Sequence, residues 1–126
     1  MLSTSLVPHT PRAITSYAKR QLSNALQAKY AQPVTGFLVD AYVAANAAVG
    51  IIYGHAGQDG TGRFDDGHLI RSSDVVEIRQ SDGRWLIQTL NSTYVIVTFK
   101  QHVGWRSLEA FLGMQSKVFV ASKRLH

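Results

Sequence analysis

The stretch Arg84-Trp-Leu-Ile-Gln-Thr-Leu90, followed by Asn91-Ser92 and then Thr93-Tyr-Val-Ile-Val-Thr-Phe99, has the pattern of two strands with a short connection. Both arms are rich in β-branched, aliphatic and aromatic residues, and a short polar pair joins them, so they predict a β-hairpin. Alternate residues of the first arm form two faces, and neither face is cleanly polar. We therefore expect this strand to lie in the centre of a sheet or at an interface.

Upstream of the hairpin, the sequence predicts the rest of a small antiparallel β-meander. His68–Ser73 and Val75–Arg79 have the composition of strands, and Ser81-Asp82-Gly83 is typical of a turn. The segment Gly54–Gly67 contains five glycines and indicates a loop. Before it, the β-branched and aromatic cluster Val49–Tyr53 is a candidate first strand.

Two apolar stripes with the period of a helix precede this meander. Behind Thr10-Pro11, a typical helix start, apolar residues recur every three or four positions and predict a helix over about 11–31. A second stripe of the same period runs from Val34 to Val49 and contains five alanines, which favour a helix. Small side chains let helices approach closely, so we expect helix pairing within or between chains.

Downstream of the hairpin, Ser107 is suited to capping a short apolar helix, and Lys117–Ala121 has the composition of a last strand. The sequence as a whole predicts one α+β domain over residues 1–126. Its expected order is two N-terminal helices, a small antiparallel β-meander, a short helix and a last strand. The helical part would cover about 11–49 and the β-rich part about 50–126.

Composition restricts the function classes. Of the 126 residues, 45% are hydrophobic and 17% are charged, which indicates a folded core rather than a disordered tail. The absence of cysteine excludes a disulfide scaffold, a thiolate metal site and a cysteine nucleophile. The longest apolar run, Phe37–Tyr53, is interrupted by polar residues, and the N-terminus lacks the pattern of a signal peptide. We therefore expect a cytoplasmic protein without a membrane span.

The net charge of +5 is unevenly distributed along the chain. Residues 1–39 carry four basic residues and no acids, whereas residues 40–82 carry seven of the eight acids and a net charge of −4. Residues 83–126 carry a net charge of +5. Such separation indicates complementary surfaces within a fold or between subunits, or a basic face for an anionic ligand.

Motifs for catalysis or metal binding are missing from the sequence. The glycine-rich loop runs from Gly60-Thr-Gly62 into Arg63, so it matches neither the dinucleotide fingerprint nor the P-loop, and a calcium loop would need an oxygen ligand at Arg63. The five histidines lack metal-ligand spacing, and there is no nucleophile elbow. We therefore expect a protein that is not an enzyme and holds neither a metal nor another cofactor.

Aromatic and polar residues in the β-rich part point instead to ligand binding. Trp85 and Arg106 belong to a basic, tryptophan-containing region, where a ring beside a guanidinium can stack on a base and neutralise a phosphate; core packing is the alternative role for the tryptophan. Asn91 and Thr93 end the hairpin and could bond the polar edge of a nucleotide, although turn geometry also explains the asparagine. Arg71, between an isoleucine and two serines, is a candidate for a site or an interface.

Two stretches carry a resemblance to a known family: Gly62-Arg-Phe-Asp-Asp-Gly-His-Leu-Ile-Arg-Ser-Ser-Asp-Val-Val76 and Ile87-Gln-Thr-Leu-Asn-Ser-Thr-Tyr-Val95. Within about residues 50–100, the chain resembles the first-described Thoeris anti-defence family of small phage proteins. The resemblance implies a sponge that binds cyclic ADP-ribose-type immune signals without degrading them and oligomerises to form its pockets. It also implies that Arg71 and Asn91 contact the ligand.

The leading hypothesis is a non-catalytic phage protein that sequesters a cyclic ADP-ribose-type or cyclic nucleotide signal in the host cytoplasm and so counters antiphage defence. Its expected ligand-binding residues are Arg71, Trp85, Asn91, Thr93 and Arg106, and its N-terminal helices would form a homo-oligomer. One alternative is a small phage protein that inhibits a host defence enzyme by direct protein–protein binding. Another is a nucleic-acid-binding β-barrel, which the acidic middle segment makes the least favoured of the three.

Overall fold

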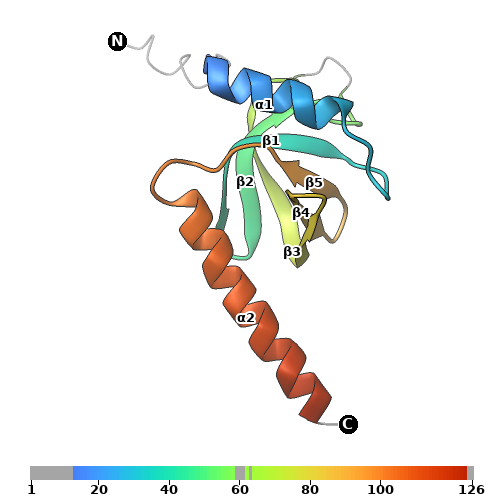
Figure 1. Ribbon diagram of the computed structural model, residues 1–126, viewed down its shortest axis with the longest axis vertical. Coiled ribbons are helices and arrows are strands. Elements are labelled where there is room, and N and C mark those ends of the chain that lie inside the picture. The colour runs from blue at the N-terminus through green and yellow to red at the C-terminus, as the bar shows by residue number, and fades with distance from the viewer. Residues whose placement is uncertain (1–12, 59–61, 63, 125–126) are drawn as a thin grey trace.

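Five strands follow one another around a closed barrel, with one helix before them and one after them (Figure 1). The computed structural model describes residues 13–58, 62 and 64–124, with side chains as far as Gln115. In chain order the elements are α1 (Ser16–Gln27), β1 (Gly36–Ala44), β2 (Ala47–Tyr53), β3 (Leu69–Ser81), β4 (Arg84–Thr89), β5 (Thr93–Ile96) and α2 (Gly104–Arg124).

The barrel is a meander that closes on itself. Consecutive strands pair antiparallel from β1 to β5. A meander with an odd number of strands ends in the direction in which it began, so the closing pair, β5 with β1, is parallel. It joins Gly36–Leu38 to Tyr94–Ile96. This seam removes the two free edges that an open five-stranded sheet would present.

The interior of the barrel is filled by a mixture of branched and very small side chains. Leu38, Ile52 and Ile87 are fully buried there, and Ala41 and Ala48 lie among them, also fully buried. A barrel of only five strands has little interior volume, so small residues are needed where its walls approach each other. The alanines of this segment therefore allow the strands to pack closely around the narrow interior of the barrel.

The prediction of a second helix over Val34–Val49 is wrong, because this segment forms most of the β1–β2 hairpin. Its turn residues, Ala45 and Asn46, have positive φ angles of 47° and 66°. Two consecutive residues in that region form the turn that best matches the twist of a hairpin. The long-range packing of a sheet thus overrides the modest helix propensity of alanine. The helical N-terminal part ends with α1, and strands begin at Gly36 rather than near residue 50.

The expected first helix is present as α1 and lies across the outer face of the barrel (Figure 1). It begins at Ser16 rather than near residue 11, and the Thr15 Oγ1 caps it by accepting a hydrogen bond from the Ala18 N–H at 3.1 Å. The expected start at Thr10-Pro11 lies outside the described residues. Ala18 and Ala25 are buried against outward-facing side chains of the strands. Most of the apolar stripe of α1 is therefore used within its own chain, whereas Tyr17 and Leu26 stay exposed.

At the C-terminal end, a single long helix replaces the expected short helix and last strand. Lys117–Ala121, expected as a strand, lies inside α2. The helix begins where the backbone of Gly104 touches the barrel so closely that a Cβ there would lie 2.5 Å from the carbonyl oxygen of Ala41. From this point α2 runs along the barrel and then projects beyond it (Figure 1).

One glutamine ties α2 to an otherwise unpaired part of β3. Residues 75–81 of β3 pair with β4 on one side only. On the other side, the Gln115 Oε1 accepts a hydrogen bond from the Ile78 N–H at 2.9 Å, and the Gln115 Nε2 donates one to the Ile78 carbonyl at 3.0 Å. The carboxamide thus makes the same two bonds that a neighbouring strand would make at this residue.

The other strand predictions are largely confirmed. The candidate strand Val49–Tyr53 lies in β2, and His68–Ser73 joins Val75–Arg79 in the single long strand β3. The hairpin around Asn91-Ser92 is present as β4 and β5. The α+β class is therefore confirmed, but one helix precedes the strands and the other follows them. Neither helix of the described chain combines the length and apolarity needed to cross a membrane.

Candidate functional site

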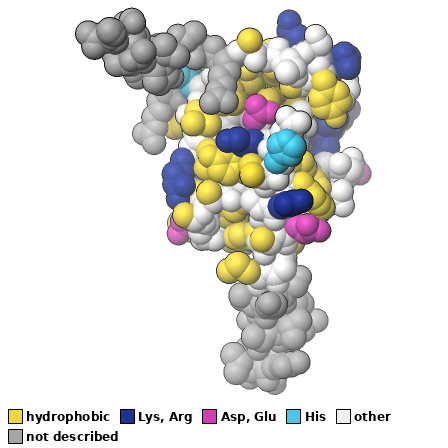
Figure 2. All heavy atoms as spheres, turned by 90° about the vertical axis from the view of Figure 1, so that its left-hand side faces the viewer, with side chains coloured by type: hydrophobic (Ala, Val, Ile, Leu, Met, Phe, Trp, Pro, Cys, Tyr) yellow, Lys and Arg dark blue, Asp and Glu magenta, His cyan; other side chains and the backbone are white. Residues whose placement is uncertain are grey.

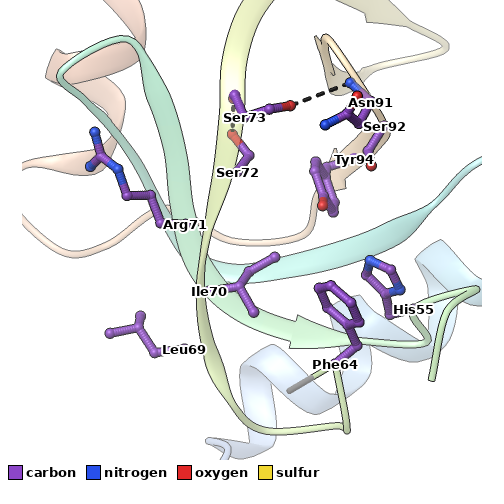
Figure 3. A pocket seen from close by; sticks show the side chains of 10 residues that line it. All are labelled: His55, Phe64, Leu69, Ile70, Arg71, Ser72, Ser73, Asn91, Ser92 and Tyr94. Carbon is purple, nitrogen blue, oxygen red and sulfur yellow. Dashed lines mark hydrogen bonds between the residues drawn. The ribbon is translucent and has the colours of Figure 1, made fainter. Parts of the chain in front are cut away.

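A pocket of about 370 Å³ opens at one mouth of the barrel (Figure 3). It arises because β3 changes partners: Leu69–Asp74 pair with β2, and pairing with β4 begins only at Val75, where β4 reaches its last residue, Thr89. The barrel wall is therefore open between the first half of β3 and the β4–β5 turn. We call this opening the mouth pocket; barrel mouths are common ligand sites.

One wall of the mouth pocket is a pair of stacked rings that follow β2. The rings of His55 and Phe64 lie 4.1 Å apart and only 9° from parallel. The His55 Nδ1 accepts a hydrogen bond from the Gly57 N–H at 2.8 Å, so the neutral imidazole carries its hydrogen on Nε2. Burial lowers the pKa of His55 below the ordinary value of 6.5. The wall therefore presents an aromatic surface with a neutral N–H donor at physiological pH.

The floor of the pocket is formed by Tyr94 and Ile70, whose side chains point inward from β5 and β3 (Figure 3). Tyr94 is only 4% exposed, yet its hydroxyl has no hydrogen-bond partner within the described part of the chain. No buried side-chain oxygen or nitrogen of the described residues lacks a partner, so this hydroxyl is not sealed in the core. It opens onto the pocket, where it can bond a ligand.

Hydrogen bonds hold the polar rim of the pocket in place. The Ser72 Oγ accepts from the Ala48 N–H at 2.9 Å and donates to the Ser73 carbonyl at 2.6 Å, while the Ser73 Oγ accepts from the Asn91 N–H at 3.3 Å. The Ser72 bond to Ala48 connects β3 with β2, and the Ser73 bond to Asn91 connects the β4–β5 turn with β3. The carboxamide of Asn91 makes no hydrogen bond to other described residues, so it remains available to a ligand.

The charge at the pocket is positive. Among the described residues that line it, Arg71 is the only charged side chain at neutral pH, and no carboxylate is present. Its guanidinium makes a long hydrogen bond of 3.4 Å to the Ala45 carbonyl and extends from β3 on the side opposite Tyr94 (Figure 3). A rotation of this side chain would be needed to bring the cation over the pocket. The lining favours a neutral or anionic ligand.

Thr93 lies in a second, more open cavity of about 260 Å³ on the other side of the Asn91–Ser92 turn, which we call the turn hollow. Its other lining residues include Thr35 and Gln88, and Asn91 and Ser92 line both cavities. The structure therefore places three of the predicted site residues at or beside the mouth pocket, with Asn91 and Thr93 at one turn and Arg71 on β3. Arg71 and Asn91 line the mouth pocket, and Thr93 lies directly beside it.

The other two predicted residues lie elsewhere. Trp85 is at the opposite end of β4 from Asn91, where its ring packs against Trp105 at 5.7 Å and against the barrel core. Arg106 is exposed on the first turn of α2. On the face at the left of Figure 1, cationic side chains are scattered singly among apolar and acidic ones rather than gathered in one basic patch (Figure 2). The five residues therefore do not line a single pocket.

Sequence reasoning missed the residues that form the wall and floor of the pocket, His55, Phe64 and Tyr94. Strand alternation could have placed Tyr94 inside a barrel, since it faces inward like the residue two places later in β5. The ring stack had no such signal, because it joins the two ends of a loop that only the folded chain brings together.

The chemistry of the site gives no indication of a metal centre: no group of three or more metal-ligating side chains is found among the residues that the structure describes. Comparison with known proteins adds nothing to the geometry. No protein-family model matches the chain, and no curated protein or solved structure is significantly similar to it. The resemblance to the Thoeris anti-defence family therefore stays a prediction.

Proposed function

We propose that this chain is a non-catalytic binding protein that holds a small nucleotide-type ligand in the mouth pocket. The observation that carries the proposal is the Tyr94 hydroxyl, which lies at the floor of the pocket and has no hydrogen-bond partner among the residues that the structure describes. The fold leaves such a group unbonded at some cost unless water or a ligand completes it. The surrounding rings, amide and cation are the groups that recognise a base and a phosphate.

In this proposal, a planar ring stacks beside the His55–Phe64 pair. The Tyr94 hydroxyl and the His55 Nε2–H hydrogen-bond its polar edge, and the Asn91 carboxamide supplies both a donor and an acceptor from the rim. Arg71 rotates toward a phosphate of the ligand. Each of these roles requires binding only, so the ligand leaves chemically unchanged.

The biological role follows from the resemblance: the ligand is a cyclic ADP-ribose-type or cyclic nucleotide signal, and the protein counters host antiphage defence by sequestering it. A homo-oligomer remains part of the proposal. Most of the apolar stripe of α1 packs on its own barrel, but Tyr17 and Leu26 stay exposed, so α1 still offers an apolar surface to a second copy. Sedimentation of the purified protein measures its oligomeric state directly.

The decisive experiment is thermal unfolding of the protein with cyclic ADP-ribose isomers, cyclic di- and trinucleotides, and a short single-stranded DNA. A ligand at about 100 times its Kd should stabilise the fold by about 2.7 kcal/mol. We expect one cyclic nucleotide to raise Tm and to be recovered intact after denaturation. A chemically altered ligand would contradict the non-catalytic role, and a shift with DNA alone, or with none of these compounds, would contradict the proposed ligand class.

A further inference from the structure

We infer that the ligand has two parts, with its ring in the mouth pocket and an oxygen-rich second part, a phosphorylated sugar, in the turn hollow. This inference rests on the proposed function and specifies its ligand. It is motivated by the shared boundary of the two cavities, since Asn91 and Ser92 line both. A ligand that leaves the mouth pocket across this turn enters the turn hollow directly.

The side chains of the turn hollow present hydrogen-bond donors. The Thr93 Oγ1 accepts from the Gln32 Nε2 at 3.2 Å, and the Thr35 Oγ1 accepts from the Thr93 N–H at 3.0 Å. Each hydroxyl thus has an acceptor position occupied within the fold and retains its own hydrogen for another acceptor. The Gln88 Oε1 accepts from the Arg79 guanidinium at 3.4 Å, which leaves the Gln88 NH₂ group to donate.

The charges around the turn hollow do not oppose an oxygen-rich group. No carboxylate is found among its described lining residues. Behind the lining, Arg79 donates hydrogen bonds to Gln32 and to Gln88, so its positive charge lies next to two residues that support or form the hollow. The carboxylate of Glu77 offsets part of that charge from 3.1 Å away. The Arg79–Glu77 pair is neutral as a whole, so phosphate and ribose oxygens are favoured by the donor groups of the lining and by the lack of a carboxylate among its described residues.

The two cavities also differ in what they can hold. The mouth pocket offers stacked rings and apolar contacts, whereas the turn hollow has no aromatic side chain among its described lining residues. A mononucleotide would place its base in the mouth pocket and reach only the edge of the turn hollow. A nucleoside diphosphate sugar would occupy both, so it should bind more tightly.

The test compares AMP with ADP-ribose by calorimetric titration of the unaltered protein, Thr93→Val and Thr93→Ser. We expect ADP-ribose to bind at least about tenfold more tightly than AMP. Thr93→Val removes one donor and should weaken ADP-ribose about five- to tenfold, with AMP unchanged. Thr93→Ser retains the hydroxyl and should bind both compounds like the unaltered protein. Matching Tm values for the two variants would establish that the fold is intact.

Three results would overturn the inference. Equal affinities for AMP and ADP-ribose would mean that the mouth pocket is the whole binding site. That result would not contradict the proposed function. An equal loss of affinity for both compounds in Thr93→Val would mean that the residue acts through the fold. Failure of both compounds to bind would contradict the inference of a two-part ligand. The thermal unfolding experiment with cyclic nucleotides and DNA would then test the proposed function separately.

Discussion

Tyr94 illustrates how a single residue can belong to the core and to a site at once. Its ring is buried among the residues that fill the barrel, while its hydroxyl opens onto the mouth pocket without a partner in the described structure. Tyr94→Phe should therefore change the free energy of unfolding by no more than about 0.5 kcal/mol, yet weaken ligand binding about five- to tenfold. Urea unfolding and calorimetric titration measure the two effects.

Tyr17→Phe is the matched control for that substitution, because Tyr17 is exposed on α1 and does not line the pocket. It should alter neither quantity. If Tyr94→Phe destabilised the fold but left ligand affinity unchanged, the hydroxyl would have a structural role and the site assignment would be wrong.

His55 should make stability depend on pH in a defined direction. Burial lowers its pKa in the folded protein below the ordinary value of 6.5, so the unfolded chain takes up a proton at a higher pH than the folded protein does. The free energy of unfolding should therefore fall as the pH drops below about 6.5 and level off below the folded-state pKa. Urea unfolding at a series of pH values between 7.5 and 5 measures this fall.

The control for the pH series is His55→Asn, whose side-chain oxygen can still accept from the Gly57 N–H but does not titrate. Its stability should decline less between pH 7.5 and 5 than that of the unaltered protein. Identical declines in the two proteins would show that other groups cause the pH dependence.

At the same scale, the sequence indicated the surroundings of Asn91 better than those of Trp85. Asn91 was identifiable because an asparagine in a short turn between two strands must lie at the end of a hairpin, where barrel mouths are found. The indole ring of Trp85 is chemically suited to stacking on a ligand. In the structure it packs on the barrel core instead, because its position on β4 brings it against Trp105. Composition predicts the chemistry of a side chain, whereas its surroundings depend on the completed barrel.

Among the elements, the β1–β2 hairpin shows why periodicity alone was misleading. The run of alanines and apolar residues matches a helical stripe as well as it matches two strands that both contribute to a narrow interior. The informative signal was Asn46, which ends a possible two-residue turn after Ala45. The β4–β5 hairpin was easier to predict because its turn is polar and its strands contain few helix-favouring residues.

Gln115 adds two hydrogen bonds to the apolar contacts that attach α2 to the barrel. Gln115→Leu keeps a side chain of similar size but leaves the N–H and carbonyl of Ile78 without partners, so it should lower the free energy of unfolding by about 1–2 kcal/mol. Gln101→Leu, at an exposed position in the preceding turn, is the matched control and should stay within about 0.5 kcal/mol. Equal stability of both variants in urea would mean that the two bonds to Ile78 contribute nothing.

On the scale of the whole molecule, we expect α1, the barrel and the start of α2 to unfold together. α1 shares two apolar clusters with the strands, and Leu108 of α2 is fully buried in the barrel core. Urea transitions followed by tryptophan fluorescence, which reports Trp85 and Trp105 near α2, and by far-ultraviolet circular dichroism should therefore coincide. Two separate midpoints would show that α2 detaches before the barrel unfolds.

The parallel seam between β1 and β5 also has a consequence for synthesis of the chain. Thr35 and Thr93, which bond to each other beside the seam, are 58 residues apart. At about 5–20 residues per second, a ribosome needs roughly 3–12 s to add the intervening segment. During that interval the nascent β1 has no partner on its β5 side, and an unpaired strand edge is a template for pairing with another chain. We therefore expect the incomplete barrel to be most prone to pairing with another chain before its last strand leaves the ribosome.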